Sequence, residues 1–195
     1  MLGVVAACFL IGWQTSAPAP TDAPGSASNA VPRVVVGEIT GNPGNSLMIP
    51  LYYTPYPNVP LRSFTVEIEY VSNSLKFKRA EKGTAAESAG AEVEAVLTDG
   101  AADPKGVTRS KLRLTLSLTD KQPQRGLPEG LLAYLLFQLS TQAKPFVIKL
   151  NTAVVSAQDI QNPPRKVSKV YAKAGTVVVE LADVNPEATC FFFSH

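Results

Sequence analysis

Polar and apolar residues alternate along most of the chain from Arg33 onward. The alternation is clearest in residues 63–70 (SFTVEIEY) and in residues 111–118 (KLRLTLSL). Successive side chains of a β-strand point to opposite faces of a sheet, so this pattern predicts strands with one buried and one solvated face. A slip of one residue would turn a whole apolar face to solvent, and the register of these strands is therefore well specified.

Turn signals separate the alternating runs. They are GNPGN at residues 41–45, Asp99-Gly100 and DPKG (103–106) in a longer hairpin loop, and Asn162-Pro163-Pro164. Many short strands without crossover helices predict an all-β fold, a sandwich or a barrel. About nine strands are expected, the last of which can split at Ala174-Gly175: 34–39, 46–53, 61–70, 75–81, 91–98, 110–119, 130–139, 146–156 and 167–180.

Two segments admit a second interpretation. Residues 84–96 are rich in Ala and Glu and would suit a helix, but Ser88-Ala89-Gly90 interrupts them, so we expect a loop followed by a strand. Residues 130–137 (GLLAYLLF) are apolar almost throughout, which fits a short helix or a central strand buried on both faces. Pro128 and the strands expected on both sides favour the strand.

The first residues of the chain suggest export. Residues 1–13 (MLGVVAACFLIGW) form an uncharged apolar run, shorter than the roughly 20 residues that span a bilayer but long enough for the apolar core of a signal peptide. Ala17-Pro18-Ala19 offers small residues for cleavage, so an export signal is expected over residues 1–19. Val5-Ala6-Ala7-Cys8 also fits a bacterial lipobox in which Cys8 carries a lipid, and both forms of export stay open.

The regions on either side of the expected domain differ from it in composition. Residues 20–32 are dominated by Pro, Ala, Ser and Gly, which predicts an extended, disordered linker. The folded domain is expected over residues 33–180, and residues 181–195 form a tail with Cys190 and three consecutive Phe. The chain has two cysteines, and removal or lipidation of Cys8 would leave no partner for an intramolecular disulfide.

Composition and motifs argue against several function classes. The net charge is only +2, unlike that of a strongly basic nucleic-acid binder. The single His is His195, and the chain shows no G-x-S-x-G motif, metal-ligand cluster or phosphate loop. Glu67 and Glu69 share one face of one strand, where solvated carboxylates are commoner than a glycosidase pair. We therefore expect no catalysis, no cofactor and no metal.

Four segments matter as an ordered set: RVVVGEITGNPGNSLMIP (33–50), SFTVEIEYVSNSLKF (63–77), GLLAYLLFQL (130–139) and AGTVVVE (174–180). Together they resemble a cohesin domain over nearly everything from Arg33 to Glu180. The resemblance implies a jelly-roll β-sandwich, a fold that cohesins share with carbohydrate-binding modules of the same superfamily. It also implies a module that docks dockerin domains and so assembles polysaccharide-degrading enzymes outside the cell.

One departure from the cohesin pattern falls on the partner-binding face. Where cohesins carry an Asn and an Asp that hydrogen-bond a dockerin helix, this chain has Ser63 and Thr65. Both hydroxyls can donate and accept hydrogen bonds, but the carboxylate is gone. Glu67 and Glu69 continue the same outward face. The predicted partner-binding face combines these four residues with the outward side chains of a strand expected nearby, Arg113, Thr115 and Ser117. An ordinary solvent-exposed sheet surface is an equally open interpretation of the same residues.

Aromatic residues offer a second type of site. Tyr52, Tyr53 and Tyr56 cluster near Pro55 and Pro57, and sugar rings stack on exposed aromatic rings, so these tyrosines are candidate carbohydrate contacts. Alternatively, one of Tyr52 and Tyr53 belongs to the core while the others pack on the prolines. The chain contains no D-x-[DN]-x-[DN]-G calcium loop, so it is not itself a dockerin.

The sequence thus predicts an exported, non-catalytic, cohesin-like module that binds a protein partner, with a dockerin-bearing protein as the first candidate. Its expected location is extracellular, at the cell surface or periplasmic, with membrane contact only through a lipid on Cys8. One alternative is a carbohydrate-binding module of the same fold that binds polysaccharide. Another is a structural surface or secretion-system domain without a ligand.

Overall fold

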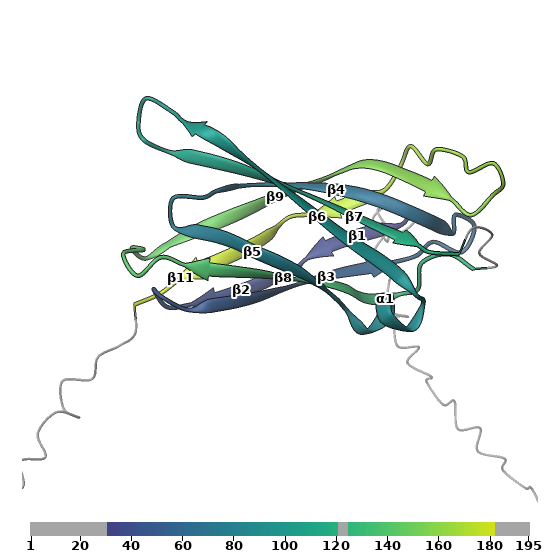
Figure 1. The fold of residues 1–195 in the computed structure, drawn as a ribbon, viewed down its shortest axis with the longest axis horizontal. Helices are drawn as coiled ribbons and strands as arrows, with labels where there is room; N and C mark the ends of the chain where they lie inside the picture. Colours follow the sequence, from purple (N-terminus) through teal and green to yellow (C-terminus); the bar gives the residue numbers. More distant parts are fainter. Residues whose placement is uncertain (1–30, 121–124, 182–195) are drawn as a thin grey trace, which may run out of the picture.

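The computed structural model describes residues 31–120 and 125–181. Within these residues the chain forms two β-sheets that pack face to face (Figure 1). One sheet has five strands in the order β10-β1-β3-β8-β5, and the other has six in the order β2-β11-β9-β4-β7-β6. The fold class predicted from the sequence, an all-β jelly-roll sandwich, is confirmed.

The strand bounds follow the predicted runs closely, and residues 130–139 form a strand as favoured above. The five-stranded sheet contains β1 (Arg33–Val36), β3 (Ser46–Thr54), β5 (Leu75–Lys82), β8 (Gly130–Leu139) and β10 (Tyr171–Lys173). The six-stranded sheet contains β2 (Glu38–Gly41), β4 (Leu61–Val71), β6 (Ala91–Ala102), β7 (Thr108–Leu118), β9 (Phe146–Asp159) and β11 (Gly175–Val179).

The core lies between the inner faces of the two sheets, where the apolar half of each alternating pattern is buried. Aromatic rings join the sheets. Tyr53 of β3 stacks on Phe64 of β4 with ring centroids 5.4 Å apart, and Tyr70 of β4 meets Phe137 of β8 edge to face at 5.3 Å. These contacts fix which side of each strand faces outward.

Two predicted strands divide because the chain crosses from one sheet to the other. The predicted strand 34–39 breaks at Gly37, so that β1 pairs with β3 while β2 pairs with β11. Gly37 is required there because a Cβ atom would lie 2.7 Å from Cγ of Pro50. The expected split at Ala174-Gly175 is confirmed, and it separates β10 from β11 in the same way. The GNPGN turn after β2 therefore links the two sheets and does not close a hairpin.

The structure corrects two local predictions. Residues Thr84–Ser88 form a short helix, α1, where a loop was expected, because Ala86 is buried there and the amide of Glu87 donates to the carbonyl of Gly83. Asp99-Gly100 lies within β6 and is no turn, since the strand continues to Ala102 through a shift in its pairing with β7. The hairpin turns at residues 103–106, where Asp103 Oδ1 accepts the amides of Lys105 and Val107.

Several predictions lie outside the described residues. These are the export signal over 1–19 with Cys8, most of the linker over 20–32, and the tail beyond Leu181 with Cys190. Among residues 31–120 and 125–181, no helix has the length and apolar character needed to cross a membrane.

Candidate partner-binding face

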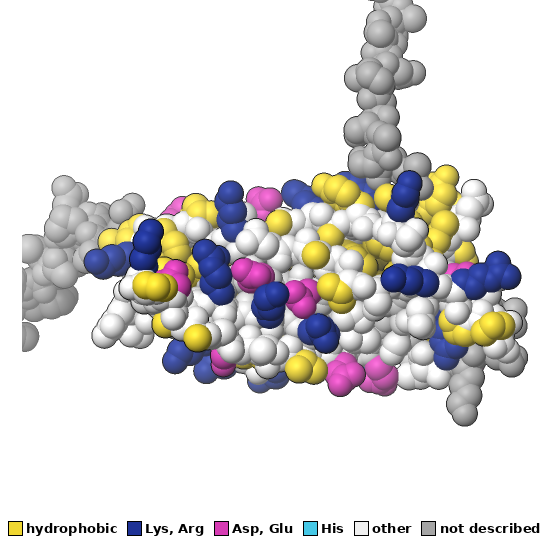
Figure 2. All heavy atoms as spheres, turned by 90° about the horizontal axis from the view of Figure 1, so that it is seen from above, with side chains coloured by type: hydrophobic (Ala, Val, Ile, Leu, Met, Phe, Trp, Pro, Cys, Tyr) yellow, Lys and Arg dark blue, Asp and Glu magenta, His cyan; other side chains and the backbone are white. Residues whose placement is uncertain are grey.

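The seven residues of the predicted partner-binding face lie together on the outer surface of the six-stranded sheet. β4 and β7 are antiparallel neighbours, and their register pairs Ser63 with Ser117, Thr65 with Thr115, and Glu67 with Arg113. Figure 2 looks onto this sheet and shows acidic and basic side chains interleaved across its middle. We call these seven residues together with Lys111 the polar face: Ser63, Thr65, Glu67, Glu69, Lys111, Arg113, Thr115 and Ser117.

One half of the polar face carries hydroxyl groups. The Oγ1 atoms of Thr65 and Thr115 lie 3.1 Å apart and share a hydrogen bond in which either can donate. Ser63 Oγ donates to Oε1 of Gln158 on β9 over 3.4 Å. A hydroxyl donates once and accepts twice, so each of these groups keeps hydrogen-bonding capacity for a partner.

The other half is an ion-pair cluster. Lys111 Nζ lies 3.1 Å from Oε1 of Glu67 and 3.8 Å from Oε2 of Glu69, and Arg113 Nη2 lies 3.4 Å from Oε2 of Glu67. The hydrogen bond from Lys111 lowers the pKa of Glu67, and the same contact raises the pKa of Lys111. Two acids and two bases thus neutralise one another on this half of the face.

Lys111 was missed by the sequence reasoning, although it occupies an outward position of the 111–118 pattern. Its role depends on the pairing of Lys111 with Glu69 across two strands, which lie 42 positions apart in sequence (111 − 69). Alternation along one strand carries no information about that neighbour. The only signal in the sequence that could have pointed to Lys111 was its positive charge, which is opposite to the charges of Glu67 and Glu69.

Neighbouring strands extend the polar face with a few apolar groups. On β6, Glu94 pairs with Thr115 and Val96 pairs with Arg113, which places both beside the polar face. On the opposite flank, Val155 lies in β9 at a shift in the pairing with β4. Val96 and Val155 are about half exposed. Such a mixture of exposed apolar and polar groups is found in protein interfaces and on other protein surfaces alike.

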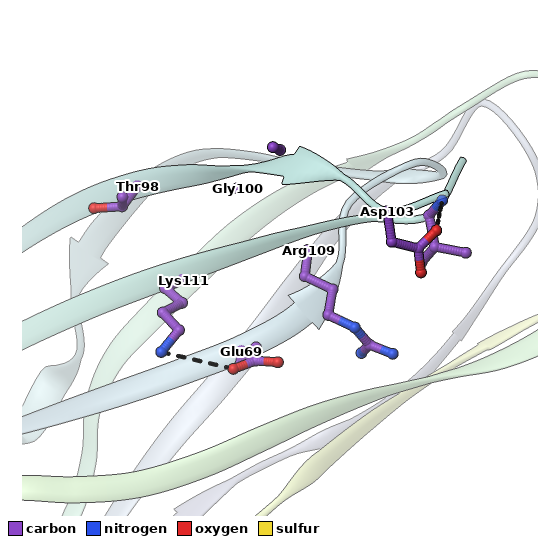
Figure 3. Close-up of a pocket in the computed structure, with 8 residues that line it drawn as sticks. Glu69, Thr98, Gly100, Asp103, Arg109 and Lys111 are labelled. Atoms are coloured by element: carbon purple, nitrogen blue, oxygen red, sulfur yellow. Dashed lines mark hydrogen bonds and ion pairs between the residues drawn. The ribbon is translucent and has the colours of Figure 1, made fainter. Parts of the chain in front are cut away.

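A shallow hollow of about 290 Å³ lies where the polar face meets the β6–β7 hairpin. Its lining includes Glu69, Thr98, Asp103, Arg109 and Lys111. Figure 3 shows Lys111 reaching toward Glu69, while the side chain of Arg109 extends from the neighbouring position of β7. The hollow could take a side chain of a partner that rests on the polar face.

The structure separates the three candidate carbohydrate contacts, and one of Tyr52 and Tyr53 belongs to the core, as the alternative interpretation expected. Tyr53 is 1 % exposed and belongs to the core, where burial raises the pKa of its hydroxyl. Tyr52 points the opposite way and is exposed, and Tyr56 is partly buried in the turn that pairs it with Val59. The three rings therefore do not share one surface, because adjacent residues of a strand face opposite sides.

The acidic residues of the polar face are arranged for ion pairing. Glu67 and Glu69 share Lys111 and lie on a flat sheet surface. In the part of the chain that the structure describes, no group of three or more His, Cys, Asp or Glu is placed to hold a metal ion.

Neither a protein-family model nor a curated protein sequence matches the chain. Solved structures do. The seventh ScaB type I cohesin from Pseudobacteroides cellulosolvens superposes with a TM-score of 0.59 at 14 % identity, over 85 % of this chain and 98 % of that one. The OlpC cohesin of Clostridium thermocellum, solved in a complex with a dockerin, gives 0.57 at 17 % identity, over 80 % and 98 %. A cohesin from Clostridium acetobutylicum gives 0.54 at 22 % identity, over 80 % and 96 %.

These similarities establish the fold. Each cohesin is covered almost completely, so the match includes the whole sandwich and is not limited to one sheet. The cohesin-like fold expected from the ordered segments is therefore confirmed, at identities low enough that family models do not detect it.

Proposed function

We propose that the chain is an exported, non-catalytic binding module that docks a protein partner through the polar face. The partner proposed is a dockerin-type domain, in extracellular polysaccharide degradation or surface assembly. The observation that carries the proposal is the polar face itself: hydroxyls, a neutral ion-pair cluster and flanking valines on one flat sheet of a cohesin fold. Several of the similar cohesin structures are complexes with dockerins.

The chemistry of the polar face suits a partner helix that carries hydrogen-bonding side chains. Ser63 and Thr65 stand where the resemblance places the Asn and Asp of cohesins, so recognition here relies on neutral hydroxyls. Neutral groups cost less to remove from water than a carboxylate does. Glu67 and Glu69 keep their charge balanced by Lys111 and Arg113, so burial under a partner leaves no unpaired ion.

Export is supported by the apolar run of residues 1–13 and the Pro-rich residues that follow it. A linker of that composition would hold the sandwich away from the surface to which the chain is attached. Attachment through Cys8 can be tested separately: Cys8→Ala should move the protein out of the membrane fraction, and unchanged fractionation would argue against the lipid.

The decisive experiment is capture of secreted proteins from the source organism by the purified full chain in calcium-containing buffer. The expected result is a protein with paired calcium-loop repeats, released when calcium is chelated. Thr65→Arg should abolish capture, because a long charged side chain replaces a hydroxyl in the centre of the polar face.

Thr54→Arg is the matched control, since Thr54 is an exposed threonine at the end of β3 in the other sheet. It should capture the same protein as the wild type. Capture that Thr65→Arg leaves unchanged would show that the polar face is not the docking surface.

A further inference from the structure

The outer surface of the five-stranded sheet differs from the polar face because its centre is apolar. Tyr52 pairs with Val35 on one side and Leu131 on the other, Pro50 pairs with Tyr134, and Met48 pairs with Leu136. Side chains directly opposite one another point to the same side of a sheet, so all seven lie on one surface. We call this set the apolar face: Val35, Met48, Pro50, Tyr52, Leu131, Tyr134 and Leu136.

The apolar face is open to solvent in the described structure. Met48 is 47 % exposed and Tyr52 is 45 % exposed, while the other five side chains are partly exposed. The seven residues run across three adjacent strands, β1, β3 and β8, with no charged side chain among them. A contiguous apolar patch of this kind on a soluble domain marks a surface that another molecule covers.

Charged side chains lie around the apolar face, and they include Arg33 and Lys76, whose pairing with Thr54 and Gln138 places them on the same side of the sheet. On β5, Arg79 pairs with Leu136 and Glu81 pairs with Tyr134, and the two charges form an ion pair at 2.7 Å. At the opposite rim, Lys173 lies 3.4 Å from Glu38. These two pairs carry no net charge, so the surplus charge around the apolar face is positive and lies outside its centre.

We propose that the apolar face is a self-association surface, on which two copies of this chain pack sheet against sheet about a two-fold axis. A two-fold contact places the same surface of each copy against the other, so an apolar centre meets an apolar centre. Interfaces between identical chains are also more apolar than those between different proteins, which fits a centre without charges.

The area available is sufficient for such a dimer. The outer surface of the whole sheet, five strands about 4.8 Å apart with an average of about seven residues of 3.4 Å, measures nearly 600 Å² on each copy. Two copies would thus bury about 1,200 Å² in total, which is the lower end of the range for specific interfaces. Buried area does not by itself fix affinity, so the test must cover a wide range of protein concentrations.

This arrangement leaves both polar faces on the outside of the pair, on opposite sides. The proposal therefore does not rest on the proposed function: a chain that binds no dockerin could still pair through the apolar face. In the same way, a chain that docks a partner could be a monomer. The two proposals can fail independently, and the variants that test them lie in different sheets.

Sedimentation velocity of the purified full chain, from about 1 µM to about 1 mM, tests the proposal. The wild type should shift from monomer to dimer across this range. Met48→Lys and Tyr52→Lys should each weaken dimerisation at least about ten-fold, and the double variant should be a monomer throughout, because each lysine would face an apolar surface twice in one dimer.

Val155→Lys is the matched control. Val155 is 46 % exposed, almost the same as Met48 and Tyr52, but it lies in the six-stranded sheet, so this variant should dimerise like the wild type. Circular dichroism confirms that each variant is folded, as expected for side chains already half exposed. Raising the salt concentration from 0.1 to 0.5 M provides a measurement without mutation: dimerisation should not weaken, since no net charge is matched across the interface.

Three results would overturn the proposal. If the wild type stays monomeric at every concentration, the proposed dimer does not form. Association that survives in the double variant, or that Val155→Lys disrupts equally, would place the contact elsewhere in the chain. A monomeric wild type retained on insoluble polysaccharide through Tyr52 would assign the apolar face to a sugar.

Discussion

The two outer surfaces of the sandwich are built on the same principle and present opposite chemistry. The strands β3, β4, β7 and β8 each bury one side in the shared core, so that side is constrained to be apolar. The outward side is free to vary, and it carries hydroxyls and ion pairs on β4 and β7 but aliphatic and aromatic groups on β3 and β8. Because packing does not require either outer composition, the difference between the two faces points to two different contacts.

The inner side of a strand should matter far more for stability than its outer side, and β8 allows both to be tested. Phe137 is buried and touches the rings of Tyr70 and Phe77, so Phe137→Ala should lower the free energy of unfolding by about 3–5 kcal/mol. Tyr134→Ala, on the apolar face, should cost only about 1 kcal/mol. Urea unfolding measures the free energy of unfolding of both variants. Equal decreases would contradict the assignment of Phe137 to the inner side of β8 and of Tyr134 to its outer side.

The two outer faces should respond separately to charge. Thr115→Arg on the polar face should lower partner affinity at least about ten-fold while leaving sedimentation unchanged. Met48→Lys on the apolar face should do the reverse. Calorimetric titration with the captured partner and sedimentation velocity of the same samples give the two readouts. A variant that changes both would show that the faces are coupled through the sheets.

The ion-pair cluster should make the polar face sensitive to acid. The pKa of Glu67 is lowered from 4.5 in the folded state, so its pairing stabilises the fold above pH 4.5 and is lost as the pH falls through the lower, folded-state pKa. Glu67→Gln should lower Tm by about 2 °C or less at pH 7, and the difference should close as the pH falls below 4.5 and through the folded-state pKa of Glu67.

Glu94→Gln serves as the control for that measurement, since Glu94 is an exposed acid beside the polar face, and no ion pair of it occurs within the described residues. Its Tm should follow the wild type from pH 7 to pH 3. A gap between wild type and Glu67→Gln that stays constant over this range would mean that the ion pairs do not stabilise the fold.

The smallest effect is expected at the rim of the apolar face. The Arg79–Glu81 pair is exposed to solvent, so Arg79→Ala should change the free energy of unfolding by less than about 0.5 kcal/mol. It should also leave the dimerisation constant within about three-fold of the wild type, because side chains at the exposed rim of an interface contribute little to binding. A larger change in the dimerisation constant would show that Arg79 and Glu81 lie within the dimer contact.

Alternation predicted the strands well because burial on one side constrains every second residue. Residues 46–53 and 61–70 were each predicted to within one residue of β3 and β4. The break at Gly37 was missed, because it depends on Pro50 of a neighbouring strand. Helix α1 was missed because five residues are too few to show a helical period.

The candidate site was predictable in part for the same reason. The outward position of Ser63, Thr65, Glu67 and Glu69 followed from the pattern of one strand, whereas the contacts of Lys111 required the pairing of β4 with β7. The residue type alone does not tell whether a tyrosine side chain points to the core or to solvent, since tyrosine occurs in both places. The neighbouring positions of Tyr52 and Tyr53 show both outcomes.

The division of the first and last strands between two sheets has a mechanical consequence. β1 runs parallel to β10, and β2 runs parallel to β11, side by side in their sheets (Figure 1). The sandwich therefore begins at Arg33 and ends at Val179 at opposite ends of parallel strands. A force that pulls these two ends apart acts along the strands. It therefore loads all the hydrogen bonds between Glu38–Gly41 and Thr176–Val179 at once, in shear. A force that peeled the two strands apart from one end would break these bonds one at a time. The described sandwich should therefore resist a force that pulls its two ends apart better than a force that peels these strands from one end.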